Sequence, residues 1–458
     1  MVFSSITFLY YFLVLLLLVY FIVPKNYRNL VLLIFSLLFY FLGEPKYIFV
    51  LILSGVLNYY FGKLVTGKNK KLFLVLACFY NIFQLLVFKY TNFFIDNINN
   101  LFHLNISFLN IVMPIGISFF TFQGLGYVID VYKGVHEPSD NLLYFMTYLC
   151  LFPQLVAGPI VRYSDVASSL YKRDTNYNEI AEGVGRFVIG LAKKVLLANV
   201  LGEVIASLVD VNVLSSWLKP ILFTLQIYFD FSGYSDMAIG LGLMFGFKFP
   251  ENFNYPLISS SITDFWRRWH ISLSSWFRDY VYIPLGGNRV SKLKWIRNIF
   301  IVWFLTGFWH GASWNFILWG LYFGVILVIE KMFLGKYLEK TKVIKYFYSL
   351  LIIIIGFLIF NSNSISDVII ELKNMFFISD IPFTSKETIY YLKSNLVLFI
   401  LAIVAATPLV KNVICRLKKT RVSIVLDILE PVIYIALLTL CTAFLIDASF
   451  NPFLYFRF

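Results

Sequence analysis

The sequence predicts an all-α polytopic membrane protein, and two observations, composition and charge pattern, lead to this prediction. Hydrophobic residues make up 60% of the 458 residues and charged residues 14%, whereas soluble domains average about 45–50% apolar and about 25% charged residues. Lysines and arginines lie in short clusters between apolar runs. The formal net charge of +13 is therefore interpreted as a signal of membrane orientation and not of nucleic-acid binding.

About 20 apolar helical residues cross a bilayer core, which predicts N-terminal helices over residues 6–23, 29–42, 47–64 and 71–90. The first run lacks a basic n-region and a small-residue cleavage site, so we expect a retained helix and not a signal peptide. Basic residues cluster in alternate loops, which places the N-terminus outside and makes residues 91–110 an outward loop.

Two later apolar stretches contain helix breakers. Residues 111–131 include Pro114, and residues 142–160 include Pro153 and Pro159. Irregular backbone at membrane depth is tolerated only when it is buried in protein or lines a water-filled cavity. These stretches therefore predict an internal cavity, and the basic residues flanking the second allow it to enter the membrane and return.

Ionisable residues occur in the next apolar runs. Lys193 and Lys194 are expected to snorkel to the membrane interface. Asp230 and Asp236 lie within residues 219–245, where the favoured interpretation pairs them with basic residues and the alternative has them contact a ligand.

Residues 248–294 are too charged to span and are predicted to form short helices on the cytosolic side. Asp264 is expected to cap one of them, since Asp is a favoured N-cap residue, and residues 284–288 form a turn. Residues 297–331 are basic at both ends and are interrupted near the middle by Gly307, Gly311 and Ser313. A short-armed hairpin dipping from the cytosol is one interpretation; a long tilted helix followed by a short one is the other.

The C-terminal part is simpler. Helices are expected over residues 347–360, 396–410 and 424–445, with a polar outward loop after the first, a basic cytosolic loop at 411–421 and an aromatic tail at 451–458. We count about ten to twelve membrane segments in one domain, residues 1–458, divided at 1–110, 111–331 and 346–458. The four cysteines are isolated in sequence, so neither a disulfide framework nor a metal site is predicted.

His310 is the first candidate for a reactive centre. It lies in the sequence Gly-Phe-Trp-His-Gly within an apolar segment, and an ionisable side chain at membrane depth is a functional-site hypothesis by default. The hairpin would place it near the bilayer midplane. Histidine has an unperturbed pKa of about 6.5 and can act as a general base near neutral pH; a hydrogen-bonded core histidine is the structural alternative. Groups that could orient its ring or bind a carbonyl oxygen are Trp309, Trp314, Asn315 and His270.

His270 closes the run Trp266-Arg267-Arg268-Trp269-His270, which is expected to lie on one helix. Its arginines could bind phosphates through charge-assisted hydrogen bonds. They could instead hold carboxylates such as those of Asp264 and Asp279, or lipid headgroups.

Several segments together resemble the membrane-bound O-acyltransferase family, in its alginate and peptidoglycan O-acetyltransferase branch. The similarity lies in residues 114–123, 127–134, 152–160, 228–238, 264–288, 307–319 and 452–458, in family order. The resemblance implies a ring of helices with re-entrant or broken members around a central funnel. It also implies that His310 is the essential histidine and that His270 is the second motif histidine.

The same resemblance implies an acyltransferase that moves an acetyl group from a cytosolic acyl thioester such as acetyl-CoA, with no bound cofactor. The acceptor would be a hydroxyl of an extracellular polysaccharide or of a membrane-anchored, periplasmic or extracellular partner acyltransferase. Donor binding would involve Trp266, Arg267, Arg268, Trp269, Trp309, Trp314 and Asn315, in a multi-pass protein of the bacterial cell membrane that contacts lipid but no nucleic acid. D-alanyl transfer to teichoic acid by a related enzyme is the alternative, although the turn at residues 283–288 favours acetyl transfer. A polytopic transporter using His310 and Asp230 as proton-relay groups is the alternative from another class.

Overall fold

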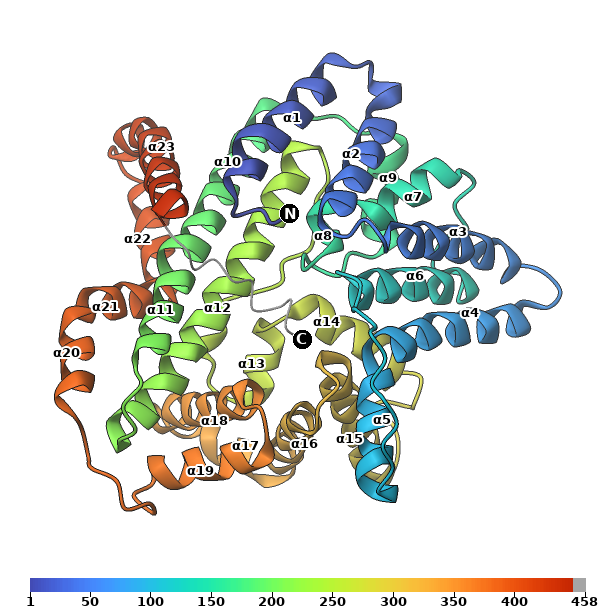
Figure 1. Ribbon diagram of the computed structural model, residues 1–458. Coiled ribbons are helices and arrows are strands. Elements are labelled where there is room, and N and C mark those ends of the chain that lie inside the picture. The colour runs from blue at the N-terminus through green and yellow to red at the C-terminus, as the bar shows by residue number, and fades with distance from the viewer. Residues whose placement is uncertain (448–458) are drawn as a thin grey trace. The chain divides into compact units, whose positions relative to one another are not determined.

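A computed structural model describes residues 1–447, which form helices and connecting segments and contain no strand (Figure 1). The chain divides into two compact units, one with residues 1–187 and 235–251 and the other with residues 188–234 and those from 252 onward. The prediction of a single domain over residues 1–458 stays a prediction. The predicted aromatic tail at 451–458 lies outside the described residues.

The first unit begins with the helices that the apolar runs predict. A π-helical segment, Thr7–Phe12, leads into α1 (Leu13–Ile22), and α2 (Arg28–Gly43), α3 (Ile48–Leu64) and α4 (Lys70–Leu85) follow. The unit continues with α6 (Ile117–Tyr132), α7 (Leu142–Cys150), α8 (Phe152–Leu155) and α9 (Tyr163–Tyr171). Helices α3, α4 and α6 pack side by side (Figure 1).

The prediction of an outward loop over residues 91–110 is wrong for its first half, which is helical. A π-helical segment, Leu86–Tyr90, joins α4 to α5 (Thr91–Phe102), and the combined helix runs for 33 residues. Two asparagines of this helix bond the returning chain. The Asn92 amide donates to the Leu109 carbonyl over 2.9 Å, and the Asn99 amide donates to the Ile106 carbonyl over 2.8 Å.

The two breaks predicted near Pro114 and Pro153 are confirmed. Helix α6 begins only after Gly116, whose φ of 74° lies in the left-handed region that glycine tolerates. A Cβ atom there would lie 2.4 Å from the Leu155 carbonyl oxygen. The two irregular segments therefore meet at a position where only glycine fits.

The second unit contains the short helices after residue 252 and the C-terminal helices, and two helices, Tyr177–Ala192 and Val213–Met244, belong partly to each unit. Helix α10 (Tyr177–Ala192) continues through the π-helical segment Lys193–Asn199 into α11 (Val200–Ser207), and α12 spans Val213–Met244. The predicted short helices are present as α13 (Ile262–Arg268) and α14 (Ile271–Phe277). Farther on lie α17 (Gly335–Glu339), α18 (Ile344–Asn361), α21 (Leu396–Ala405) and α23 (Ser423–Asp447).

Three further helices lie where loops were expected: α19 (Ile365–Met375), α20 (Lys386–Ser394) and α22 (Leu409–Leu417). Their charged residues suggested loops, but a surface helix is amphipathic and needs such a polar face. Ser364 and Asp367 form a capping box at the start of α19, which stabilises a helix boundary inside the polar stretch.

Of the two interpretations of residues 297–331, the structure has the hairpin. Helix α15 (Lys292–His310) and helix α16 (Trp314–Ile329) are joined at residues 311–313. Gly307 does not interrupt α15, because its role is in helix packing: a Cβ atom there would lie 2.3 Å from the Phe316 carbonyl oxygen. The arms are longer than expected, since α16 continues to Glu339 as a span of 26 residues. At 1.5 Å per residue, about 39 Å, this arm is long enough to cross a bilayer core.

Five described helices are long and apolar enough to cross a membrane, and the bent pair α20–α21, with a 56° angle, makes a sixth if it counts as one span. The five are Lys25–Gly43, Lys70–Phe102, Trp314–Glu339, Ile344–Asn361 and Ser423–Asp447. The protein is therefore an all-α, multi-pass membrane protein. The shorter and broken segments that would raise the total to ten to twelve stay a prediction, as does the ring around a funnel.

Candidate active site

His310 is the last residue of α15, at the turn of the hairpin, and its side chain is only 6% exposed. Three aromatic rings stand nearly perpendicular to its imidazole. The ring centroids lie 4.9 Å away for Trp319, 5.0 Å for Trp309 and 5.4 Å for Phe360. The hairpin and the end of α18 thus enclose His310 in an aromatic box formed by these three residues.

Asn315 fixes one wall of this box. Its amide nitrogen donates to the carbonyl oxygens of Ser362, over 2.7 Å, and Phe360, over 3.4 Å. The start of α16 is therefore tied to the end of α18, where Phe360 contacts His310. This geometry makes Asn315 a positioning group for the box, because its N–H donors bond the backbone carbonyls of Phe360 and Ser362.

Trp266 reaches the box through Trp319. Its ring centroid lies 5.6 Å from that of Trp319, 4.6 Å from that of Trp303 and 5.0 Å from that of Phe323. The indole nitrogens of Trp266 and Trp319 are buried and have no hydrogen-bond partner among the described residues. The Trp319 N–H, on a ring that contacts His310, and the Trp266 N–H, on the next ring, are therefore available to a bound group.

The start of α13 differs from the prediction. Ser261 is the N-cap residue, and its hydroxyl accepts from the Asp264 backbone N–H over 3.0 Å, so the expectation that Asp264 caps the helix is wrong. Asp264 instead accepts from Arg268 Nε over 2.9 Å. The neighbouring serine is as good a cap type as aspartate, which is why residue preference alone did not separate them.

A buried carboxylate from another segment holds this same helix start. Glu330 accepts from the Ile262 N–H over 2.7 Å, from the Thr263 N–H over 2.9 Å and from the Thr263 hydroxyl over 2.8 Å. A negative charge at a helix N-terminus is stabilising. Glu330 therefore fixes α13, and with it Trp266, to the chain that follows α16.

The expectation that His270 lies on one helix with Trp266, Arg267 and Arg268 is wrong. Helix α13 ends at Arg268, and His270 is the N-cap residue of α14 with a left-handed backbone, φ 44°. Its side chain is 1% exposed, and Nδ1 lies 3.1 Å from Asn252 Oδ1.

The same Asn252 oxygen accepts from the Ser272 hydroxyl over 2.9 Å. Because an amide oxygen only accepts, the Nδ1 atom of His270 is assigned the proton. Burial lowers the pKa of His270 to about 3, so the imidazole is neutral at physiological pH.

The two histidines are linked through one aromatic ring. The Trp309 centroid lies 6.2 Å from that of His270 and 5.0 Å from that of His310. His270 also packs nearly perpendicular to Phe231 of α12, with the centroids 4.7 Å apart. The histidines are far apart in the sequence, but in the structure both rings lie next to Trp309.

The remaining predicted site residues lie outside the aromatic box around His310. Trp269 is buried against Phe265 and Phe357. Arg267 is exposed on α13, Arg268 is engaged with Asp264, and Trp314 is 54% exposed.

The aspartates of α12 pair with basic residues, as the favoured interpretation expected. Asp230 lies 2.5 Å from Lys194, and both side chains are almost fully buried. Asp236 lies 2.9 Å from Arg186. The expectation that Lys194 snorkels to the interface is wrong, because its ammonium group has this buried carboxylate as a partner. The described residues contain no cluster of three or more His, Cys, Asp or Glu side chains that could hold a metal ion.

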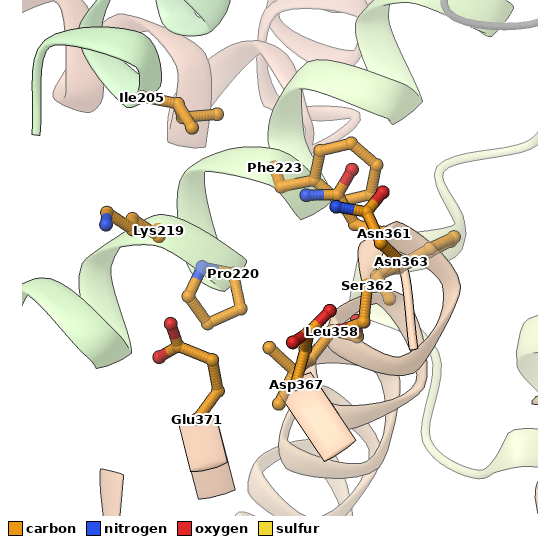
Figure 2. A pocket seen from close by; sticks show the side chains of 11 residues that line it. Ile205, Lys219, Pro220, Phe223, Leu358, Asn361, Ser362, Asn363, Asp367 and Glu371 are labelled. Atoms are coloured by element: carbon orange, nitrogen blue, oxygen red, sulfur yellow. The ribbon is translucent and has the colours of Figure 1, made fainter. Parts of the chain in front are cut away.

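A pocket of about 230 Å³ lies beside the end of α18. Figure 2 shows Asp367 and Glu371 pointing their carboxylates toward it from α19, with Lys219 and Pro220 from α12 across from them. Ser362, whose carbonyl accepts from Asn315, also lines it. The pocket is therefore polar and lies next to the segment that carries Phe360.

Comparison with known proteins reveals a family match and close relatives. The profile of the MBOAT, membrane-bound O-acyltransferase family matches residues 136–360. A probable alginate O-acetylase of Azotobacter vinelandii is 41% identical over 381 residues, which covers 80% of this chain and 76% of the relative. A peptidoglycan O-acetyltransferase of Helicobacter pylori is 36% identical over 415 residues, with 82% and 78% covered. A teichoic acid D-alanyltransferase of Bacillus subtilis is 33% identical over 252 residues, with 51% and 62% covered.

Proposed function

Because this chain belongs to the membrane-bound O-acyltransferase family and is a membrane O-acetyltransferase, we propose that His310 is the general base of acyl transfer. The donor is a cytosolic acyl thioester, acetyl-CoA, and the acceptor is a hydroxyl of an extracellular polysaccharide or of a partner acyltransferase. The observation that carries this proposal is the position of His310, buried at the hairpin turn beside the uncommitted indole N–H of Trp319.

The proposed reaction needs one proton acceptor and one oxyanion stabiliser. The His310 imidazole takes the proton of the acceptor hydroxyl while the hydroxyl oxygen attacks the thioester carbonyl carbon. The C–S bond then breaks, and the CoA thiolate leaves with the proton that the imidazolium returns. General acid–base help of this kind typically contributes about 10²–10⁴ in rate.

Trp319 is the candidate to stabilise the developing oxyanion. Its indole ring contacts His310, and its N–H has no partner among the described residues. A fixed donor aimed at the charge that develops in the transition state lowers the barrier more than it strengthens substrate binding. Trp319 lies within the family-like segment 307–319, but the sequence alone assigns it no role, because its contact with His310 depends on the fold.

Donor and acceptor are proposed to approach from different sides of the box. The exposed guanidinium of Arg267, at the margin of α13, is the candidate for the donor phosphates. His270 is neutral and hydrogen-bonded, so we assign it a positioning role through Trp309. The acceptor hydroxyl approaches through the pocket of Figure 2, whose carboxylates and amides can bind sugar hydroxyls.

Orientation follows from the loop charges. The basic start of α15 lies on the cytosolic face of a bacterial cell membrane and the end of α18 on the outer face, with the N-terminus outside. The relatives named for alginate and peptidoglycan favour a polysaccharide acceptor; the relative named for teichoic acid supports D-alanyl transfer as a second candidate.

The experiment uses oriented proteoliposomes with alginate or peptidoglycan oligosaccharides inside, with and without a partner acyltransferase. Labelled acetyl-CoA is supplied at the face that carries the basic start of α15. Acetyl label on the enclosed acceptor supports the proposal. Label delivered only from a D-alanyl carrier protein would favour the teichoic acid branch, and solute flux without acyl transfer would favour a transporter.

A further inference from the structure

The first unit contains a basic pocket far from His310 in the sequence. Its volume is about 240 Å³, and it is lined by residues of two separate segments, 25–29 and 169–174, together with Tyr144. Four of the lining side chains are cationic: Lys25, Arg28, Lys172 and Arg173. The only acidic lining residue is Asp174, which pairs with Lys25 over 2.6 Å. The pocket therefore carries excess positive charge.

Arg173 forms the rigid wall of the pocket. Its Nε donates to the Tyr20 hydroxyl over 3.0 Å, and its Nη1 donates to Asn29 Oδ1 over 2.9 Å. Its guanidinium also lies over the Phe247 ring, 4.3 Å from the centroid. Its partners are all neutral, so none of these contacts cancels its charge.

Arg28 provides a second guanidinium in the same pocket. It lies over the Tyr20 ring, 4.8 Å from the centroid, and its Nε is buried with no hydrogen-bond partner among the described residues. A buried charged donor without a partner is costly. The contacts described for Arg28 and Arg173 are with neutral groups, so an anion in the pocket could neutralise their charge and accept a hydrogen bond from Arg28 Nε.

The position of the pocket suggests the source of that anion. Lys25 and Arg28 stand at the start of a candidate membrane span, Lys25–Gly43, and the loop charges predict that both lining segments face the cytosol. The two segments contact each other in the pocket, which supports their location on the same side of the membrane. Basic pockets at the ends of membrane helices bind phosphate-bearing lipid headgroups. The pocket is smaller than the about 300–1,000 Å³ that drug-sized ligands occupy, which favours a headgroup over a nucleotide.

We propose that this pocket is a phosphate site that binds the headgroup of an anionic phospholipid at the cytosolic membrane surface. Arg28 and Lys172 supply charge-assisted bonds to the phosphate oxygens, and Arg173 holds the pocket in shape. The inference does not depend on the acyl-transfer proposal.

The test compares phosphatidylglycerol with phosphatidylcholine binding to the purified full-length protein by native mass spectrometry. The variant is Arg28→Gln/Lys172→Gln, which avoids the structural Arg173. The matched control is Lys68→Gln/Lys71→Gln, which removes the same charge on the predicted same side. Lys68 lies in the α3–α4 loop and Lys71 in the first turn of α4; both are exposed and neither lines the pocket. Wild type and control should prefer phosphatidylglycerol, and the pocket variant should lose about fivefold of that preference for each cation removed.

Two outcomes would overturn the proposal. The first is equal binding of both lipids by the wild type, and the second is an equal loss of phosphatidylglycerol preference in the control variant. Either result would mean that the pocket acts only as part of the general surface charge. A parallel arm adds inorganic phosphate or CoA. Displacement by either, in the absence of any phosphatidylglycerol preference, would assign the pocket to a soluble phosphate compound instead of a lipid.

Discussion

The indole of Trp319 stands nearly perpendicular to the imidazole of His310, with an interplanar angle of 82° and ring centroids 4.9 Å apart. Trp319 belongs to the second arm of the hairpin and His310 to the end of the first. Their contact depends on close packing of the arms, which Gly307 and Gly320 permit at positions where a Cβ atom would meet backbone oxygens. The hairpin thus sets the geometry in which the proposed base and oxyanion donor meet.

Replacing Trp319 by phenylalanine removes the indole N–H but keeps an aromatic ring beside His310. We expect kcat to fall about 10²–10³-fold, the loss typical of one oxyanion donor, with a much smaller change in KM. The measurement is initial rates of acetyl transfer over a range of acetyl-CoA concentrations. Trp303→Phe is the matched control, since Trp303 packs against Trp266 and Trp319 but makes no ring contact with His310 among those described. An equal loss in both variants would contradict the assignment.

Asn315→Asp removes the two N–H donors that hold Phe360 and Ser362 while keeping the side chain's size. We expect kcat to fall, since a misplaced wall changes the position of reacting groups, together with a loss of stability of about 1–3 kcal/mol from unmade hydrogen bonds. Asn298→Asp separates the two effects. Asn298 likewise donates to two backbone carbonyls, those of Leu285 and Gly287, away from His310. That variant should lose stability and keep its kcat; a matching fall in kcat would show that the Asn315 effect is only destabilisation.

His270 should make the protein less stable in acid. Its pKa is about 3 in the folded protein, against about 6.5 for an unperturbed histidine. Below pH 6.5 the unfolded chain takes a proton that the folded chain refuses, so stability falls as the pH decreases from 6.5 toward 3, by about 1.4 kcal/mol per unit from this group. Above pH 6.5 it contributes no pH dependence.

His270→Asn keeps a donor for Asn252 and suits a left-handed backbone, so it tests this prediction. The stability lost between pH 7 and pH 5 should shrink by roughly 2 kcal/mol, measured as the unfolding midpoint at each pH. His103→Asn is the control, because His103 is also left-handed but exposed. No difference between the two variants would refute the neutral, buried state of His270.

The Lys194–Asp230 pair distinguishes the transferase from a proton-relay transporter. Removing one partner, as in Lys194→Met, leaves an uncompensated buried charge and should cost about 3–5 kcal/mol. The double variant Lys194→Met/Asp230→Leu should recover much of that stability and retain acetyl transfer, since neither group takes part in the chemistry. Thermal unfolding and transfer assays on the same preparations provide the check. A stable double variant without activity would support a proton-relay role for Asp230.

The parts of the fold that sequence could predict are those with a local cause. Apolar run length predicted the helices through Leu64, and Pro114 and Gly311 lie at real breaks. The loop expected after residue 90 failed because the bonds of Asn92 and Asn99 to the returning chain are not visible in composition. The expected cap at Asp264 failed because Ser261 was an equally good cap type.

The candidate site was predicted only in part, for a similar reason. His310 and Trp309 are adjacent in sequence, and their apolar setting makes them visible. Trp319, Phe360 and Glu330 act through tertiary contacts with segments that are remote in sequence, and such partners cannot be chosen from a single chain without its fold. The partner of Lys194 was missed in the same way, since Asp230 lies on another helix.

The most direct test of the central claim is acetyl transfer by purified His310→Gln beside the wild type, in the same proteoliposomes. Glutamine keeps a polar side chain but cannot act as a base. We expect the wild-type rate to fall about 10²–10⁴-fold, while the unfolding midpoint stays close to that of the wild type. A folded His310→Gln protein that transfers acetyl at the wild-type rate would contradict the account and move the base elsewhere, with His270 the next residue to replace.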